Sequence, residues 1–258
     1  MNSFRDYPGM LPRPDQIEPV PRRVRAMLAG HTVADSTAAR YVWEWPNYPA
    51  FYLPLADVRS EFLIPGERTE RSSRGLARRH DLLVAGVHRA DCAWVYGSDA
   101  LDGLAHTVRF DWAALDAWFE EDEQVFVHPR NPYTRVDALR STRRVRVELA
   151  GAVLAESASP VLLFETGLPT RYYLNRAEVH ERHLIASDTV TACPYKGVTS
   201  QYWSVRVDGV DHPDLAWSYR YPTGGLSAIA GLIAFYNEKV DLVVDGTPLP
   251  RPITHFFN

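Results

Sequence analysis

A segment of the chain occurs twice, and this duplication limits the folds that the sequence can adopt. Residues 22–25, Arg-Arg-Val-Arg, recur at 143–146, a shift of 143 − 22 = 121 positions. The same shift relates Leu-Ala-Gly at 28–30 to Leu-Ala-Gly at 149–151. Roughly 14 of about 37 ungapped positions are identical, where chance gives about two. Two copies predict two related domains, because a solenoid is built from a longer array.

The duplication divides the chain into three parts. Residues 1–20 are rich in proline and are predicted to form an extended N-terminal arm without independent structure. Residues 21–137 form the first repeat and residues 138–258 form the second. The segment 128–137 joins them, and its prolines favour an irregular connection.

Most of each copy has the pattern of short β-strands. Residues 145–149, Val-Arg-Val-Glu-Leu, alternate between apolar and polar, which is typical of a strand with one buried face. Asp-Gly at 208–209 predicts a tight hairpin. One helix is expected per copy, over 111–121 and 227–239, where apolar residues recur at helical spacing. The predicted fold class is mainly β: two tandem antiparallel sheet assemblies, each with one short helix.

Composition excludes several classes of protein. A hydrophobic content of 46% in 258 residues is sufficient for a packed core. The net charge of −4 indicates neither nucleic acid nor a membrane surface as the main partner. The chain has no basic-then-apolar leader pattern, so a soluble cytoplasmic protein is expected. Two cysteines and nine scattered histidines lack the spacing of a disulfide framework or a metal site.

The segment 191–203, Thr-Ala-Cys-Pro-Tyr-Lys-Gly-Val-Thr-Ser-Gln-Tyr-Trp, is the candidate site. Lys196 is one of only two lysines in a chain whose other long cationic side chains are arginines, and it closely follows Cys193. An ammonium group beside a thiol would favour the thiolate. Pro194 excludes a regular helix, so we expect an irregular loop, and loops commonly carry sites. There is an alternative for each residue: Cys193 could be a small hydrophobic side chain of the core, and Lys196 could form a salt bridge at the surface.

Aromatic and acidic residues near this segment complete the predicted site. An aromatic-lined pocket with one cation suits a small molecule, and core packing is the alternative for any single aromatic residue. Glu165 and Asp241 are strand carboxylates, which act either as pocket acids or as partners of Lys196 and arginines. We predict Cys193 and Lys196 as catalytic residues. The predicted ligand-binding residues are Thr191, Tyr195, Gly197, Tyr202, Trp217, Tyr221, Glu165, Tyr173 and Asp241.

The first copy lacks the Cys-Pro-Tyr-Lys-Gly segment. At the same place it has a longer segment, 65–81, which we interpret as a loop. Its basic stretch 68–79 is interpreted as solvated. The strand predicted at 91–96 nevertheless matches that at 214–219. The first repeat is therefore expected to keep the fold with a degenerate site.

These residues resemble the domain of unknown function 427 family (DUF427), in a two-copy arrangement. The resemblance rests on Thr-x-Cys-Pro-Tyr-Lys-Gly at 191–197, Ala-Trp at 216–217, Ala-Phe-Tyr at 234–236 and the segment 128–137. It covers about 22–258. It implies small antiparallel β domains similar to the β-tent or Mss4-like folds, and the family is also labelled a nucleotidyltransferase group. Several relatives of that fold bind zinc, but this chain lacks the paired cysteines.

Three functions are compatible with the sequence. The first is an enzymatic pocket for a small, anionic molecule in the second repeat, with a reaction that the sequence does not name. The second is a non-catalytic module that binds another protein. The third is the nucleotidyltransferase activity implied by the family label. No cofactor is named by the sequence, and formation of a homo-oligomer remains open.

Overall fold

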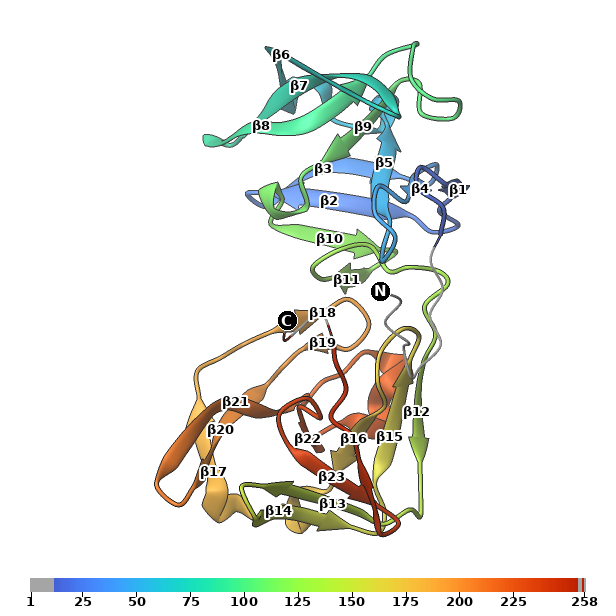
Figure 1. Ribbon diagram of the computed structural model, residues 1–258. Coiled ribbons are helices and arrows are strands. Elements are labelled where there is room, and N and C mark those ends of the chain that lie inside the picture. Colours follow the sequence, from blue (N-terminus) through green and yellow to red (C-terminus); the bar gives the residue numbers. More distant parts are fainter. Residues whose placement is uncertain (1–11, 255–256, 258) are drawn as a thin grey trace. The chain divides into compact units, whose positions relative to one another are not determined.

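The computed structural model describes residues 12–254 and 257, in two units (Figure 1). One unit comprises Leu11–Asn131 and is called the first half; the other includes Pro132–Asn258 and is called the second half. The division falls shortly before the predicted boundary at residue 137. Residues 1–11 of the predicted arm lie outside the described residues.

The first half consists of two antiparallel sheets (Figure 1). The seven-stranded sheet has the order β1-β4-β5-β9-β8-β7-β6, and the four-stranded sheet has the order β11-β10-β2-β3. The strands are β1 (Ile17–Pro19), β2 (Val24–Leu28), β3 (His31–Ser36), β4 (Arg40–Val42), β5 (Ala50–Pro54), β6 (Leu63–Ser72), β7 (Gly75–Val84), β8 (Val87–Tyr96), β9 (Thr107–Phe110), β10 (Ala117–Glu120) and β11 (Glu123–Val125).

The second half repeats this plan. Its seven-stranded sheet has the order β12-β15-β16-β22-β21-β20-β17, its four-stranded sheet has the order β14-β13-β23-β24, and β18 pairs with β19. The strands are β12 (Val136–Arg140), β13 (Val145–Leu149), β14 (Ala152–Ser157), β15 (Val161–Glu165), β16 (Arg171–Leu174), β17 (Leu184–Ser187), β18 (Ala192–Cys193), β19 (Gly197–Val198), β20 (Gln201–Val207), β21 (Val210–Ser218), β22 (Ile233–Phe235), β23 (Asp241–Val244) and β24 (Thr247–Leu249).

The main core of each half lies between its two sheets. In the first half it joins Val24 of β2 to Leu53 of β5, and in the second half it joins Val147 of β13 to Leu174 of β16. Successive strand residues point to opposite faces of a sheet. Tyr52 and Tyr173, one position earlier, therefore belong to smaller clusters on the outer face of each seven-stranded sheet. The candidate sites lie on these outer faces.

Strand register shows the equivalence of the two halves. Ala93 pairs with Phe110, and Ala216 pairs with Phe235 at the corresponding place. The next positions along β8 and β21 are Trp94 and Trp217, so these two residues are counterparts. The match between 91–96 and 214–219 and the mainly β fold in two tandem halves are confirmed.

The predicted helical segments differ from the structure. Residues 111–121 form a 3-10 turn and then strand β10, whereas 227–239 contain the end of a 3-10 helix and strand β22. Every residue of β22 is buried, so it lacks the polar alternation that marks a half-exposed strand. The 3-10 segments are Leu55–Asp57, Ser60–Phe62, Trp112–Ala114, Arg176–Glu178, Glu181–His183 and Gly224–Ile229.

Two segments predicted to be irregular contain strands. Residues 65–81 were interpreted as a loop, but they belong to the hairpin of β6 and β7. Most of β6 is exposed on both faces, which removes the hydrophobic alternation that would have revealed it. Within the predicted arm, Ile17–Pro19 forms strand β1 and pairs with β4.

Candidate functional site

The predicted pair of Cys193 and Lys196 lies in a small hairpin formed by β18 and β19. Lys196 is only 8% exposed. Its Nζ donates a hydrogen bond to Oε2 of Glu165, at the end of β15, and lies 3.6 Å from Sγ of Cys193. Burial lowers the pKa of Lys196, but the charge of Glu165, the contributions of Cys193 and Tyr173, and the hydrogen bond to Glu165 together outweigh burial and hold this pKa above its ordinary value. The ammonium group is therefore charged and paired.

Backbone contacts hold this hairpin against the segment that follows β21. The carbonyl oxygen of Tyr195 accepts a hydrogen bond from Oγ1 of Thr223, at 2.6 Å. Gly197 has a φ of +94°, a conformation that favours glycine, and the carbonyl oxygen of Tyr221 lies 3.6 Å from where a Cβ would be. Together with the ion pair to Glu165, these contacts fix the position of Lys196.

Three of the predicted aromatic residues pack together on the outer face. Nε1 of Trp217 donates a hydrogen bond to the hydroxyl oxygen of Tyr173, at 3.3 Å. Tyr202 stacks on Trp217 with ring centroids 6.3 Å apart. Burial raises the pKa of Tyr173 to about 12, so its hydroxyl group is neutral at physiological pH. These three aromatic side chains therefore mainly pack against one another in a layer on the sheet.

A row of hydroxyl groups leads from this layer to a cavity. The hydroxyl oxygen of Tyr202 is 3.1 Å from Oγ1 of Thr191 and 2.9 Å from the hydroxyl oxygen of Tyr236. The cavity has a volume of about 290 Å³. Its lining residues are Thr189, Thr191, Tyr202, Pro213, Asp214, Leu215, Tyr236, Lys239 and Phe257. We call it the tyrosine cavity; Cys193 and Lys196 are not among its lining residues.

Two predicted residues lie away from this group. Tyr221 is 80% exposed, and the guanidinium of Arg220 lies 5.7 Å from its ring centroid. Asp241 is on β23 in the four-stranded sheet, where it forms an ion pair of 2.8 Å with Arg251. The structure therefore does not bring Tyr221 or Asp241 to the tyrosine cavity.

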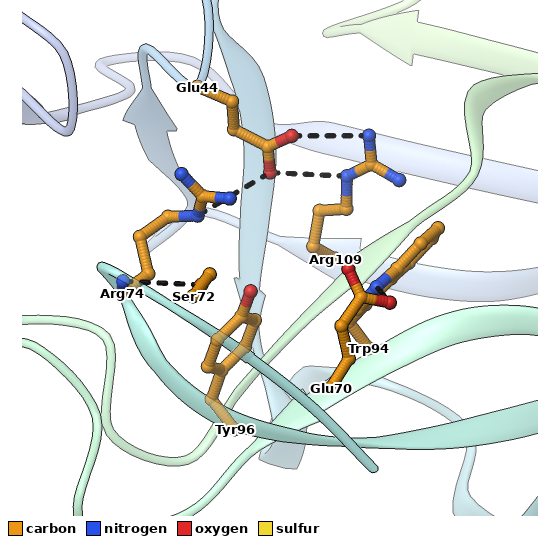
Figure 2. Close-up of a pocket in the computed structure, with 7 residues that line it drawn as sticks. All are labelled: Glu44, Glu70, Ser72, Arg74, Trp94, Tyr96 and Arg109. Atoms are coloured by element: carbon orange, nitrogen blue, oxygen red, sulfur yellow. Dashed lines mark hydrogen bonds and ion pairs between the residues drawn. The ribbon is translucent and has the colours of Figure 1, made fainter. Parts of the chain in front are cut away.

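The first half has a cavity that the sequence did not reveal (Figure 2). Its volume is about 70 Å³. It is lined by Glu44, Glu70, Ser72, Arg74, Trp94, Tyr96 and Arg109, and we call it the arginine cavity. It occupies the outer face of the seven-stranded sheet, the same face that carries the predicted residues in the second half.

Glu44 is the central carboxylate of the arginine cavity (Figure 2). Its Oε1 accepts a short hydrogen bond of 2.6 Å from the hydroxyl of Tyr52. Nη2 of Arg109 lies 3.3 Å from Oε2, whereas Nε of Arg74 lies 4.0 Å from Oε1. Burial and the nearby charge of Glu44 raise the pKa of Tyr52 well above its ordinary value. Tyr52 is therefore a permanent donor to Glu44.

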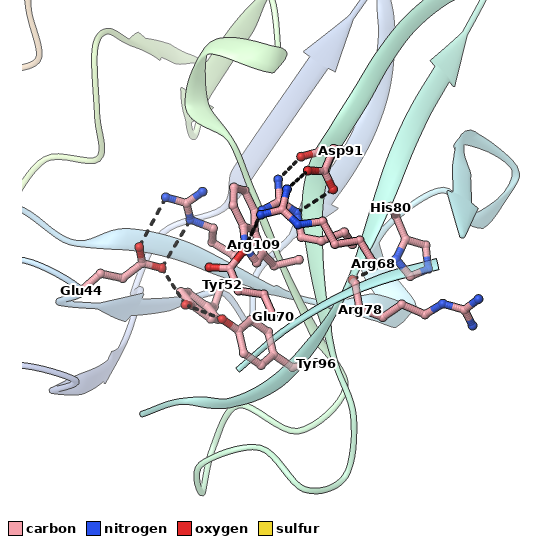
Figure 3. Close-up of polar contacts among 11 residues, drawn as sticks. Glu44, Tyr52, Arg68, Glu70, Arg78, His80, Asp91, Tyr96 and Arg109 are labelled. Atoms are coloured by element: carbon pink, nitrogen blue, oxygen red, sulfur yellow. Dashed lines mark hydrogen bonds and ion pairs between the residues drawn. The ribbon is translucent and has the colours of Figure 1, made fainter. Parts of the chain in front are cut away.

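Two guanidinium groups lie against the indole of Trp94; one of them belongs to Arg109, which Figure 3 shows beside Glu44. The ring centroid is 3.5 Å from Cζ of Arg79 and 4.2 Å from Cζ of Arg109. Nη1 of Arg79 and Nε1 of Trp94 both donate to Oε2 of Glu70, at 2.9 Å and 3.1 Å. The hydrogen bond from Trp94 and then that from Arg79 lower the pKa of Glu70.

The differences between the halves explain why the arginine cavity was missed. By register, Arg79 corresponds to Tyr202 and Arg109 corresponds to Ala234. These positions are shifted by 202 − 79 = 123 and 234 − 109 = 125, not by 121. The ungapped comparison therefore does not align them. A comparison of the two copies that allows gaps and aligns Trp94 with Trp217 would have identified the two arginines.

Two general features are absent from the described residues. No group of three or more His, Cys, Asp and Glu residues in 12–254 and 257 is arranged to hold a metal ion. Within the same residues, no helix has the length and apolar character needed to cross a membrane.

Comparison with known proteins identifies one family. A family model described as a domain of unknown function (DUF427), with the short name NTP_transf_9, matches residues 16–121 and again 137–246. The two matches fall in the two structural halves. A search of curated proteins found no match to the chain.

Proposed function

Since the chain belongs to the DUF427 family in a tandem two-copy form, we propose that it binds a small molecule in the tyrosine cavity of its second half. The observation that carries this proposal is the row of hydrogen-bonded hydroxyl groups of Thr191, Tyr202 and Tyr236 along the wall of a cavity of about 290 Å³. A concave site with apolar walls and a few converging polar groups is the usual form of a small-molecule site.

The cation of the proposed site is Lys239. It lines the tyrosine cavity and is exposed, and its Nζ lies 4.5 Å from the ring centroid of Phe257. Lys196, the other lysine, is buried and paired with Glu165. An exposed ammonium group can meet an anionic ligand without first being released from a buried carboxylate. This arrangement supports an anionic group on the ligand.

The hydroxyl groups suit binding more than proton transfer. Burial, followed by the hydrogen bond with Tyr202, raises the pKa of Tyr236 well above its ordinary value. A phenol of this kind stays neutral and both donates and accepts hydrogen bonds. Asp214 is also part of the wall, and its carboxylate accepts a hydrogen bond of 2.7 Å from Thr189. The proposed ligand therefore combines an anionic group with hydroxyl or amine substituents.

The proposal gives Cys193 and Lys196 a supporting role. They belong to the hairpin that follows Thr191, and the ion pair with Glu165 fixes that hairpin to β15. Thr191 also donates its backbone N–H to Oγ1 of Thr199 at 2.9 Å, which closes the base of the hairpin. The two residues predicted as catalytic thus support the position of one wall of the tyrosine cavity.

The cytoplasm is the proposed compartment. Cys92 and Cys193 are both free thiols. Reducing compartments preserve thiols, whereas oxidising ones favour disulfides.

A thermal-shift screen tests the proposed function. Wild-type protein would be titrated with sugar phosphates, nucleotides, hydroxylated carboxylates and thiols. A ligand at 100 times its dissociation constant stabilises a protein by about 2.7 kcal/mol, which is measurable. The variants Tyr236→Phe and Lys239→Ala should lose most of the shift, since each removes one polar group from the wall.

Tyr221→Phe is the matched control, because Tyr221 is exposed and lies outside the cavity. Its ligand response should equal that of the wild type. A ligand whose affinity is the same in Tyr236→Phe, Lys239→Ala and Tyr221→Phe would place binding elsewhere and contradict the proposal.

A further inference from the structure

The arginine cavity contains guanidinium groups whose pairing is incomplete. The Nε atoms of Arg74 and Arg109, two of its lining residues, are buried and have no hydrogen-bond partner among the described residues, although Nη1 of Arg74 donates to Oδ1 of Asp15 at 2.6 Å. The approaches of Arg74 and Arg109 to Glu44, at 4.0 Å and 3.3 Å, are ion pairs in which Nε lacks hydrogen-bond geometry. Buried donors are normally paired. This wall therefore has unused capacity to bind an acceptor.

The second half shows what a completed arginine pair looks like in this fold. Arg171 donates two parallel hydrogen bonds of 2.6 Å and 2.7 Å to the carboxylate of Glu238. Both side chains are buried. Such forked pairing is the preferred geometry of arginine with a carboxylate. Arg109 also approaches both oxygens of Glu44, but over longer distances: Nη2 lies 3.3 Å from Oε2, and Nε lies 3.3 Å from Oε1, which already accepts from Tyr52.

We propose that the arginine cavity binds a small carboxylate between Arg74 and Arg109, as a site independent of the tyrosine cavity. The volume of about 70 Å³ fits a group of a few heavy atoms, since one water occupies roughly 30 Å³. The hydroxyl-bearing residues Ser72 and Tyr96 also line this space. A whole nucleotide does not fit within it.

The charges of the wall select a monoanion. Two carboxylates, Glu44 and Glu70, line the same cavity as the two arginines. A dianionic phosphate would be repelled by both carboxylates, whereas a carboxylate carries half that charge. Glu70 already accepts from Trp94 and Arg79 through Oε2 and is 45% exposed at its side chain. It favours a ligand with a donor substituent, so 2-hydroxy and 2-amino carboxylates are the expected class.

The rest of the site limits the ligand to a small aliphatic molecule. Arg79 and Arg109 already lie against the ring of Trp94, so an aromatic ligand would have to displace them to stack there. The second half lacks these two arginines, having Tyr202 and Ala234 at the corresponding positions. The carboxylate site therefore belongs to the first half alone.

Calorimetric titration at low ionic strength with acetate, glycolate, glycine and inorganic phosphate tests the inference. Glycolate or glycine should bind more tightly than acetate, and phosphate should bind most weakly. Arg109→Ala, which installs the residue found in the second half, should weaken glycolate and glycine binding by about 10-fold or more, because it removes a charge-assisted donor. Arg78→Ala is the control, since Arg78 is exposed on the same hairpin and does not line the cavity.

A second readout does not depend on any arginine variant. The indole N–H signal of Trp94, assigned in an amide correlation spectrum by its loss in Trp94→Phe, should shift on titration of the wild type with glycolate. Tyr236→Phe should leave the Trp94 shift unchanged, which separates this site from the tyrosine cavity. Three results would each overturn the inference. In the first, none of the three carboxylates binds saturably. In the second, phosphate binds more tightly than glycolate and glycine, and in the third, Arg109→Ala binds glycolate and glycine with the affinity of the wild type.

Discussion

Lys196 and Arg74 are counterparts in the two halves of this chain. Each directly precedes a glycine of positive φ, Gly197 and Gly75, and each approaches a glutamate of the duplicated segment, Glu165 and Glu44. The lysine forms a close buried pair with its glutamate, whereas the arginine remains 4.0 Å from Glu44 and instead pairs with Asp15, whose Oδ1 is 2.6 Å from its Nη1. The cation is thus paired with the duplicated glutamate in one half and with a carboxylate from outside the duplicated segment in the other.

The buried pair of Lys196 and Glu165 should contribute strongly to stability. Lys196→Met leaves the Glu165 carboxylate buried without its cation, and we expect the free energy of unfolding to fall by about 3–5 kcal/mol. The double variant with Glu165→Gln should recover much of this loss, because it removes the uncompensated charge. Urea unfolding monitored by tryptophan fluorescence measures both changes. If Lys196→Met alone were as stable as the wild type, the stabilising role of the buried pair would be contradicted.

Stability should depend on pH through Glu238. Burial raises the pKa of this carboxyl, but the hydrogen bonds and charge of Arg171, together with the hydrogen bond from Thr254, outweigh burial and hold the pKa below its ordinary value of 4.5. A depressed pKa in the folded state gives stability that is present above about 4.5 and is lost as pH falls below it. Glu238→Gln should flatten that part of the stability–pH curve. Glu61→Gln, at an exposed position, should leave the curve unchanged.

The two cysteines should differ in their reaction with iodoacetamide. Burial raises the pKa of Cys92 to about 11, and its thiol donates a hydrogen bond to the carbonyl oxygen of Arg89. Cys193 is partly exposed. At about pH 8 we expect alkylation of Cys193 in the native protein and of Cys92 only after unfolding, since the thiolate is the nucleophile. Peptide mass spectrometry measures each site, and Cys193→Ser is the control.

The turn between β6 and β7 should require glycine. Gly75 has a φ of +117°, and an added Cβ would lie 2.7 Å from Cα of Ala100. Gly75→Ala should therefore lower the free energy of unfolding by more than Gly86→Ala, where φ is +82° but the space is open. Strained backbone alone costs about 1–3 kcal/mol, and the clash at Gly75 adds to it. Equal losses in thermal unfolding would refute this ranking.

The sequence revealed the architecture because the duplication and the strand alternation are local patterns. Alternation failed where both faces of a strand are alike, as in fully buried β22 and largely exposed β6. The structure pairs Lys196 with Glu165, one of the two roles left open for that carboxylate. The ungapped comparison of the two copies did not reveal the arginine cavity, because Glu44, Arg74 and Arg109 meet only through the register of distant strands.

The placement of the two lysines has a practical consequence for chemical labelling. Lys196 is buried and held as a charged ammonium by Glu165, so it is a poor target for amine-directed reagents. Lys239 is exposed at the wall of the tyrosine cavity. An amine-reactive fluorophore would therefore modify one lysine side chain, at a single defined position, and its emission would report on occupancy of the neighbouring cavity.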